Sequence, residues 1–153
     1  MHVHNKPCSA CPYRKDCPSG VWDKSEYLKL AEYDKETYDQ PVKVFLCHDG
    51  DRTSTICRGW LDTHQKHDLL SLRLAVSTGA ADPDIFDLPL SDVPCFESGQ
   101  AAHDYGVKEL EHPSNKAIKT QHKLIRRHPE LNCCTDEDRN MNGGCINCGD
   151  PCL

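Results

Sequence analysis

Long apolar runs and aromatic side chains are both scarce in this chain. Only 37% of its 153 residues are hydrophobic, and 7% are aromatic. No stretch approaches the roughly 20 apolar residues that a membrane-spanning helix needs, so we expect no membrane partner. The start of the chain, residues 1–6, is polar and lacks the apolar segment of a secretory signal. We therefore expect a cytoplasmic protein in a reducing environment, with a thin core that gains from metal cross-links.

Cysteine, by contrast, is abundant, with 11 residues in the chain. Cys8 and Cys11 are separated by two residues, and Cys47 and Cys57 follow downstream. Two intervening residues let both sulfurs of a turn face one ion, and a distant pair can close the chain around it. In a reducing environment such spacings indicate metal ligands before disulfides. The predicted ligands are Cys8, Cys11, Cys47 and Cys57. The alternative is that the two distant thiols are small buried core residues.

The identity of the metal follows less directly from these residues. Four thiolates suit zinc or an iron–sulfur cluster alike. Proline after Cys11 and after Cys17 is reminiscent of cluster proteins, yet the compact Cys-x-x-Cys-x-x-Cys run of ferredoxins is missing. We therefore favour zinc and keep an iron–sulfur cluster as the alternative. His48, directly after Cys47, could replace one thiol as a ligand.

A second group of cysteines lies near the C-terminus. The turn from Cys145 to Cys148 is followed by Gly149 and resembles half of a zinc ribbon. Together with cysteines that precede and follow it in the sequence, this turn could complete a second metal site. The alternative is a flexible tail whose thiols oxidise or scavenge metal. The candidate ligands are Cys133, Cys134, Cys145, Cys148 and Cys152.

Charge is distributed unevenly along the chain. The formal net charge is −6, but residues 114–128 carry five basic and no acidic groups. On a helix these basic side chains fall within about 100° of arc, and Ala117, Ile118, Leu124 and Ile125 face the other way. Such a stripe could follow a phosphate backbone, or it could be an ordinary solvated face, because no aromatic residues interleave for base stacking. The candidate contacts are Lys116, Lys119, Lys123, Arg126 and Arg127.

The pattern of elements predicts a small α+β fold that is dominated by helices. Helices are expected from Asp23, from Cys57 to about Val76 with an end near Gly79, from Ser98 to about residue 110, and from residue 113 to 128. Residues 42–47 are rich in β-formers and predict one short strand or hairpin. We expect a metal-binding domain over residues 1–131 with a zinc-knuckle-like core. Residues 132–153 form a cysteine-rich tail.

Three patterns with catalytic potential are weaker. Cys8 and Cys11 follow proline as in zinc deaminases, but no His-x-Glu precedes them. His64, His67 and Asp68 could form a hydrolytic metal site, although histidines at that spacing are common on polar helix faces. Cys95 could be a nucleophile, but it lacks the arginine six residues on that a cysteine phosphatase loop needs, and a buried thiol is the simpler interpretation.

Several spaced motifs resemble one known family. The motifs are Cys-x-x-Cys-Pro-Tyr-Arg at residues 8–14, Pro-Ser-Gly-x-Trp at 18–22, Glu-Tyr at 26–27, Phe-x-Cys-His at 45–48 and Cys-x-Gly-Trp at 57–60. They resemble an uncharacterised cysteine-rich domain of actinobacteria and their phages, over roughly residues 7–130. The resemblance implies a metal-binding domain of unknown function, phage-encoded in some cases and then acting in the host cytoplasm. In that family the position of Cys17 is often not cysteine, which argues against Cys17 as a ligand.

These observations favour a small zinc-binding protein without catalytic activity. It would act as an interaction module for a protein or nucleic-acid partner. An iron–sulfur protein with a redox or sensing role is the first alternative. A zinc hydrolase is the second, and it is disfavoured because no carboxylate–histidine set accompanies an open metal position.

Overall fold

Helices dominate the computed structural model, which describes residues 1–49 and 53–127. Single turns of 3-10 helix link them, among them Ala31–Asp34 and Lys66–Asp68. None of the helices in these two ranges has the length and apolar character that crossing a membrane requires. The five α-helices are α1 Lys24–Leu28, α2 Arg58–Thr63, α3 Leu70–Ser77, α4 Gly99–Gly106 and α5 Asn115–Arg127.

A two-stranded parallel sheet completes the α+β fold. Strand β1 (His2–Val3) pairs with β2 (Thr55–Ile56), so that His2 lies opposite Thr55 and Val3 opposite Ile56. The fold class is therefore confirmed as helix-dominated α+β.

The prediction of a strand at residues 42–47 is wrong. Within that segment only Leu46 forms a β-bridge, to Ile56. Val42 is 67% exposed and lies in a bend, so its preference for strand conformation does not produce a strand here.

Two predicted helix starts are confirmed by their caps. The carboxylate of Asp23 accepts hydrogen bonds from the backbone N–H groups of Ser25 and Glu26 at the start of α1. The hydroxyl of Ser98 accepts one from Ala101 at the start of α4. Each cap satisfies backbone donors that the first helical turn leaves without partners. Because both signals are local in sequence, they predicted the starts correctly.

The single helix expected from Cys57 to Val76 is wrong. The chain instead forms α2 and α3, with an extended residue at His64 between them. The His64 ring hydrogen-bonds through Nδ1 to the carbonyl of Trp60 at 2.8 Å, and its Nε2 lies 3.0 Å from a carboxylate oxygen of Asp34. This pairing with a residue 30 positions earlier holds the chain away from helical geometry. The predicted end near Gly79 is confirmed, since Gly79 has φ +73° directly after α3 and its cap.

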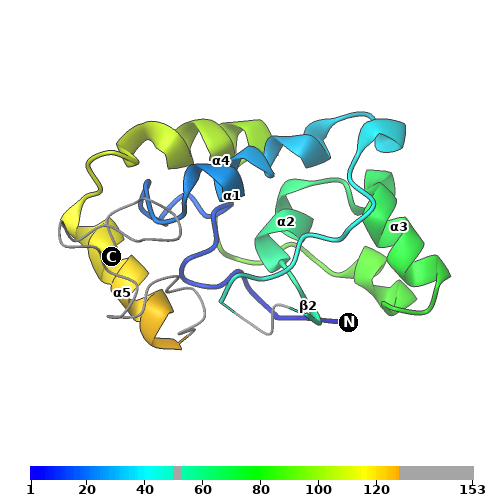
Figure 1. Cartoon of the computed structure of the whole chain (residues 1–153). Coiled ribbons are helices and arrows are strands. Elements are labelled where there is room, and N and C mark those ends of the chain that lie inside the picture. The colour runs from blue at the N-terminus through cyan, green and yellow to red at the C-terminus, as the bar shows by residue number, and fades with distance from the viewer. Residues whose placement is uncertain (50–52, 128–153) are drawn as a thin grey trace, which may run out of the picture.

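The core lies between α2 and the loops that surround it. Tyr13, Leu30, Trp60, Leu61 and Leu72 are all fully buried. Helix α4 packs along α1 and the 3-10 turn Ala31–Asp34, and α3 and α5 lie at opposite ends of the molecule (Figure 1). This arrangement places the loop of residues 7–12 and the N-terminus of α2 in the middle of the fold.

Candidate metal centre

Two pieces of backbone position the four predicted ligands. Residues 7–12, which we call the knuckle, form a tight turn in which the Cys11 N–H donates to the Cys8 carbonyl at 3.1 Å. The second piece joins Cys47 to Cys57: Cys47 N donates to Thr55 O and Cys57 N to Phe45 O, each at 2.8 Å. Cys57 is the N-cap residue of α2, as expected. Thiols that are ten residues apart in sequence are therefore carried on neighbouring backbone.

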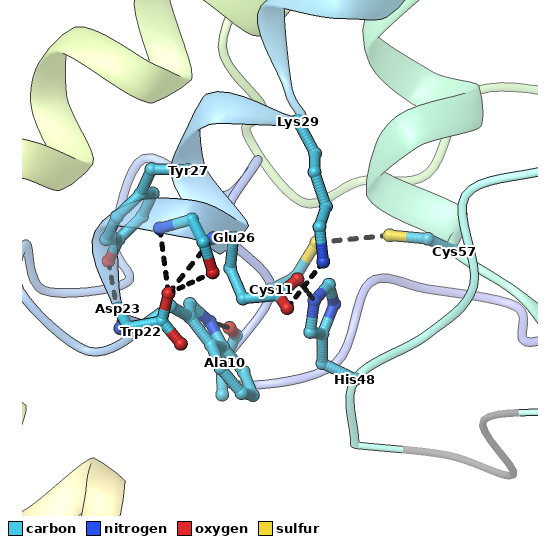
Figure 2. A network of polar contacts seen from close by, with 10 residues as sticks. Ala10, Cys11, Trp22, Asp23, Glu26, Tyr27, Lys29, His48 and Cys57 are labelled. Atoms are coloured by element: carbon cyan, nitrogen blue, oxygen red, sulfur yellow. Dashed lines mark hydrogen bonds and ion pairs between the residues drawn. The ribbon is translucent and has the colours of Figure 1, made fainter. Parts of the chain in front are cut away.

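The four thiols lie in a row. The Cys11 and Cys57 sulfurs lie 3.6 Å apart (Figure 2). Cys11 raises the pKa of the Cys8 thiol and Cys47 lowers it, which places Cys8 near both. All four are free thiols. A tetrahedral zinc ion with Zn–S bonds of about 2.3 Å separates its sulfurs by about 3.8 Å, so the measured spacing is close to one edge of such a site.

The row does not by itself form a closed cage. Within residues 1–49 and 53–127, no three His, Cys, Asp or Glu side chains converge as a group that could hold a metal ion. The row runs from Cys47 through Cys8 and Cys11 to Cys57, and its direct sulfur contact is the one between Cys11 and Cys57. Binding one ion would therefore require the other thiols to turn toward a common centre. Four thiols are a donor set that zinc accepts, and the Cys11–Cys57 spacing matches one edge of such a site.

Backbone groups two residues further along the chain act on three of the thiols. The backbone of Ala10 lowers the pKa of Cys8, that of Tyr13 lowers the pKa of Cys11, and that of Asp49 lowers the pKa of Cys47. This influence favours a thiolate, the form that binds metal.

Burial and mutual contact act in the opposite direction on these thiols. Contact with Cys11 and burial raise the pKa of Cys8, and burial raises the pKa of Cys11, which is 1% exposed. The hydrogen bond with Cys8, followed by burial, raises the pKa of Cys47. Without a cation Cys8, Cys11 and Cys47 are therefore protonated at neutral pH and are poor nucleophiles. The arrangement suits metal binding with release of protons better than covalent catalysis.

Gly59 allows the first turn of α2 to approach the knuckle. A Cβ atom at this position would overlap the Cys11 sulfur and would lie 3.0 Å from the Cβ of Tyr13. The glycine of the Cys-x-Gly-Trp motif is thus explained by close packing against a predicted ligand. Its role was missed from the sequence, although the motif itself marked the position.

His48 lies beside this group but is held by a carboxylate. Its Nε2 donates to Glu26 at 2.9 Å, and Glu26 also accepts from Lys29 at 2.6 Å (Figure 2). The hydrogen bond from His48 lowers the pKa of Glu26 to about 2. The Nδ1 atom of His48 is buried and has no hydrogen-bond partner in the described residues. Metal-bound histidines usually donate their second N–H to a carboxylate, so Nδ1 is the nitrogen through which His48 could replace a thiol.

A hollow of about 410 Å³ borders the centre on this side. Cys47 and His48 line it, together with Lys29 and Lys43 from the rim. It gives solvent a route toward the end of the thiol row.

The residues of the proposed hydrolytic site do not come together. Both ring nitrogens of His64 are occupied, by Trp60 and Asp34, and the His67 ring stacks on Phe86 with centroids 4.7 Å apart. Neither histidine presents a nitrogen to a shared ion with Asp68, since no metal-binding group forms among the described residues.

The two remaining cysteines among the described residues are isolated thiols. Burial raises the pKa of Cys95 to about 11 and that of Cys17 to about 12. A thiol with a raised pKa is mostly protonated at neutral pH, which weakens it as a nucleophile. Cys17 donates to the carbonyl of its neighbour Pro18 and makes no contact with the thiol row.

Helix α5 carries the basic stripe as expected. All five basic side chains are exposed, and Ala117 and Leu124 on the opposite face are buried. Two of the cations bind groups outside α5: Arg127 pairs with Asp49 at 2.8 Å, and Lys116 donates to the carbonyl of Asp16 at 3.1 Å. Arg126 donates from Nε to the carbonyl of His122 within the helix at 3.3 Å. The outward-facing part of the stripe is therefore formed by Lys119, Lys123 and Arg126.

The second predicted metal site lies outside the described residues. Its candidate ligands are Cys133, Cys134, Cys145, Cys148 and Cys152, all within 128–153. The boundary between the domain and the tail at residue 131 falls in the same range.

Comparison with known proteins places most of the chain in one family. Residues 3–127 match the model of a family of unknown function, DUF6283. Because the match spans more than half of the sequence, the chain belongs to this family. No curated protein and no solved structure matches it.

Proposed function

We propose that this DUF6283 protein is a small zinc-binding module in which Cys8, Cys11, Cys47 and Cys57 hold one structural ion. The observation that carries the proposal is the contact between the Cys11 and Cys57 sulfurs, which lie 3.6 Å apart, with Cys8 and Cys47 in the same row. Three of these ligands, Cys11, Cys47 and Cys57, are buried. The ion would therefore organise the fold, and the protein would act without catalysis as a binding module in the cytoplasm.

A single ion fits the sulfur spacing better than a four-iron cluster does. In a four-iron cluster each thiolate binds a different iron, so all four sulfurs are held apart. Contact between Cys11 and Cys57 instead suits two ligands of the same ion. A two-iron cluster, which places two thiolates on each iron, remains the cluster type to test. The purified protein separates these cases by colour, because zinc proteins are colourless and clusters absorb visible light.

The partner of the module is proposed from α5. Lys119, Lys123 and Arg126 form an exposed basic row on a helix whose other face is buried. Cations in such a row can neutralise successive phosphates of a nucleic acid. A protein partner with an acidic surface would use the same side chains.

The experiment is metal analysis of protein purified without oxygen, combined with four single substitutions, Cys8→Ser, Cys11→Ser, Cys47→Ser and Cys57→Ser. We expect zinc in the wild type and its loss, with unfolding, in each variant. A structural zinc contributes on the order of 10 kcal/mol, which is comparable with the whole stability of a small domain. A wild-type protein that folds with neither zinc nor iron would refute the proposed function.

A further inference from the structure

We propose that Arg14 and Trp22 are positioning residues of the metal centre, which fix the knuckle backbone in its metal-binding form. This inference rests on the proposed function and adds to it two residues that bind no metal. Both belong to the spaced motifs of the sequence, and the four predicted ligands do not account for them. Each donates hydrogen bonds to knuckle carbonyls, from opposite ends of the turn.

Arg14 holds the first half of the knuckle. Its Nη1 donates to the carbonyl of Pro7 at 3.2 Å and to that of Cys8 at 3.4 Å. Its Nε and Nη2 donate to the two oxygens of Asp16 at 2.7 and 2.6 Å. The paired contact with Asp16 fixes the plane of the guanidinium, and only the planar fork of arginine can serve both sets of acceptors at once.

Trp22 holds the second half. Its indole Nε1 donates to the carbonyl of Ala10 at 2.8 Å (Figure 2). The indole is 8% exposed, and the ring of His48 lies against it with centroids 4.6 Å apart. Since the Glu26 carboxylate fixes His48 in turn, the indole is held in place by groups that also border Cys47.

These contacts hold three peptide groups of the knuckle. The peptides before and after Cys8 are held by Arg14, and the peptide before Cys11 is held by Trp22. The peptide between Ser9 and Ala10 lies between the held groups. A knuckle fixed in this way does not need to be ordered when the ion binds, which removes an entropic cost of binding.

The charge of Arg14 adds a second contribution. A zinc ion with four thiolates carries a net negative charge, and a guanidinium beside it stabilises that state. Arg14 is well placed for this role because its side chain is only 17% exposed. Lysine at this position would keep the charge and lose the fork, so it separates the two contributions.

The test uses cobalt, which reports thiolate coordination by its colour, and a chelator competition that measures affinity. The variants are Trp22→Phe, Arg14→Gln and Arg14→Lys. Substitutions outside the ligand sphere typically lower metal affinity by about 10- to 100-fold, and we expect this loss for Trp22→Phe and Arg14→Gln. The cobalt spectrum should stay unchanged, because the ligands are the same. Arg14→Lys should lose less metal affinity than Arg14→Gln, because it keeps the charge. If Arg14→Gln does not fold, Arg14→Lys tests the role of Arg14 instead.

Two control variants separate positioning from general stability. Trp60→Phe removes an indole N–H that has no acceptor in the described residues, and Arg73→Gln removes an exposed cation on α3. If the Trp22→Phe and Trp60→Phe variants show the same decrease in melting temperature, Trp22→Phe should still bind cobalt about tenfold more weakly than Trp60→Phe. Equal affinities would overturn the positioning role while the proposed function stands. A wild-type protein that binds neither cobalt nor zinc would overturn both.

Discussion

Replacing Gly59 with alanine tests whether the contact between α2 and Cys11 is as close as the structure has it. Gly59 lies within α2, where alanine is favoured over glycine by about 1 kcal/mol on helix propensity alone. The added Cβ would, however, overlap the Cys11 sulfur and press on the Cβ of Tyr13. Both residues are buried, at 1% and 0% exposure, so neither can move into solvent. Propensity and packing therefore predict opposite signs.

The packing cost should prevail. Adding atoms to a well-packed core costs about 1 to 3 kcal/mol, and here the displaced group is a predicted ligand. We expect Gly59→Ala to lower the unfolding free energy of the metal-loaded protein by about 1 to 2 kcal/mol after the propensity gain is included. We also expect an altered cobalt spectrum, because the Cys11 sulfur moves.

Denaturant unfolding and visible absorption of the cobalt-loaded protein measure these two effects. Gly99→Ala is the matched control, because its Cβ would overlap the carbonyl of Leu30, which is not a predicted ligand. It should destabilise the protein and leave the cobalt spectrum as in the wild type. If Gly59→Ala is as stable as the wild type or more stable, with an unchanged spectrum, the close packing of α2 against the knuckle is refuted.

Three further predictions concern the periphery of the centre, the tail and α5. Cys17→Ser should leave metal content unchanged and cost little stability, since Cys17 lies outside the thiol row; loss of zinc in this variant would add Cys17 to the ligands. Truncation after Leu131 should remove about one equivalent of metal and preserve the first site, whereas equal metal content in both proteins would exclude the second site. Reversing the charges of Lys119, Lys123 and Arg126 should abolish nucleic-acid binding without changing the circular dichroism spectrum. Wild-type affinity should fall with salt at a log–log slope no steeper than about −4 or −5. If the wild type fails to bind nucleic acid at low salt, α5 serves another purpose.

The parts of the fold that were predicted correctly depend on short stretches of sequence. The caps at Asp23 and Ser98 and the glycine after α3 each act within a few residues, so the sequence alone locates them. Of the four thiols that spacing groups as ligands, the structure brings Cys11 and Cys57 into contact, and the ligand set itself stays a prediction.

The errors arise where distant residues decide the local structure. The helix expected through His64 is broken because its ring pairs with Asp34, a contact that no local pattern reveals. The strand expected at 42–47 is reduced to one bridge, from Leu46 to Ile56, and the partner that β2 pairs with in the sheet is β1. In both cases propensity was present and tertiary contacts outweighed it.

The same limit applies to the residues that support the centre. Gly59, Arg14 and Trp22 were visible in the sequence only as members of motifs. Their roles depend on which carbonyl or sulfur lies within reach, and that depends on the folded chain. Cysteine spacing in sequence thus points to candidate donor atoms, whereas the groups around them become visible only in the folded chain.

The contact between buried thiols is the physical argument behind the proposed cation. The sulfurs of Cys11 and Cys57 lie 3.6 Å apart in the core, yet a neutral thiol is a weak donor and a weak acceptor, so this contact stabilises the fold only slightly. Neighbouring thiols and burial raise the pKa of Cys8, Cys11 and Cys47, which opposes a thiolate. A bound metal ion would supply the positive charge that lets the thiols ionise in place, and this is why we propose an ion at the thiol row.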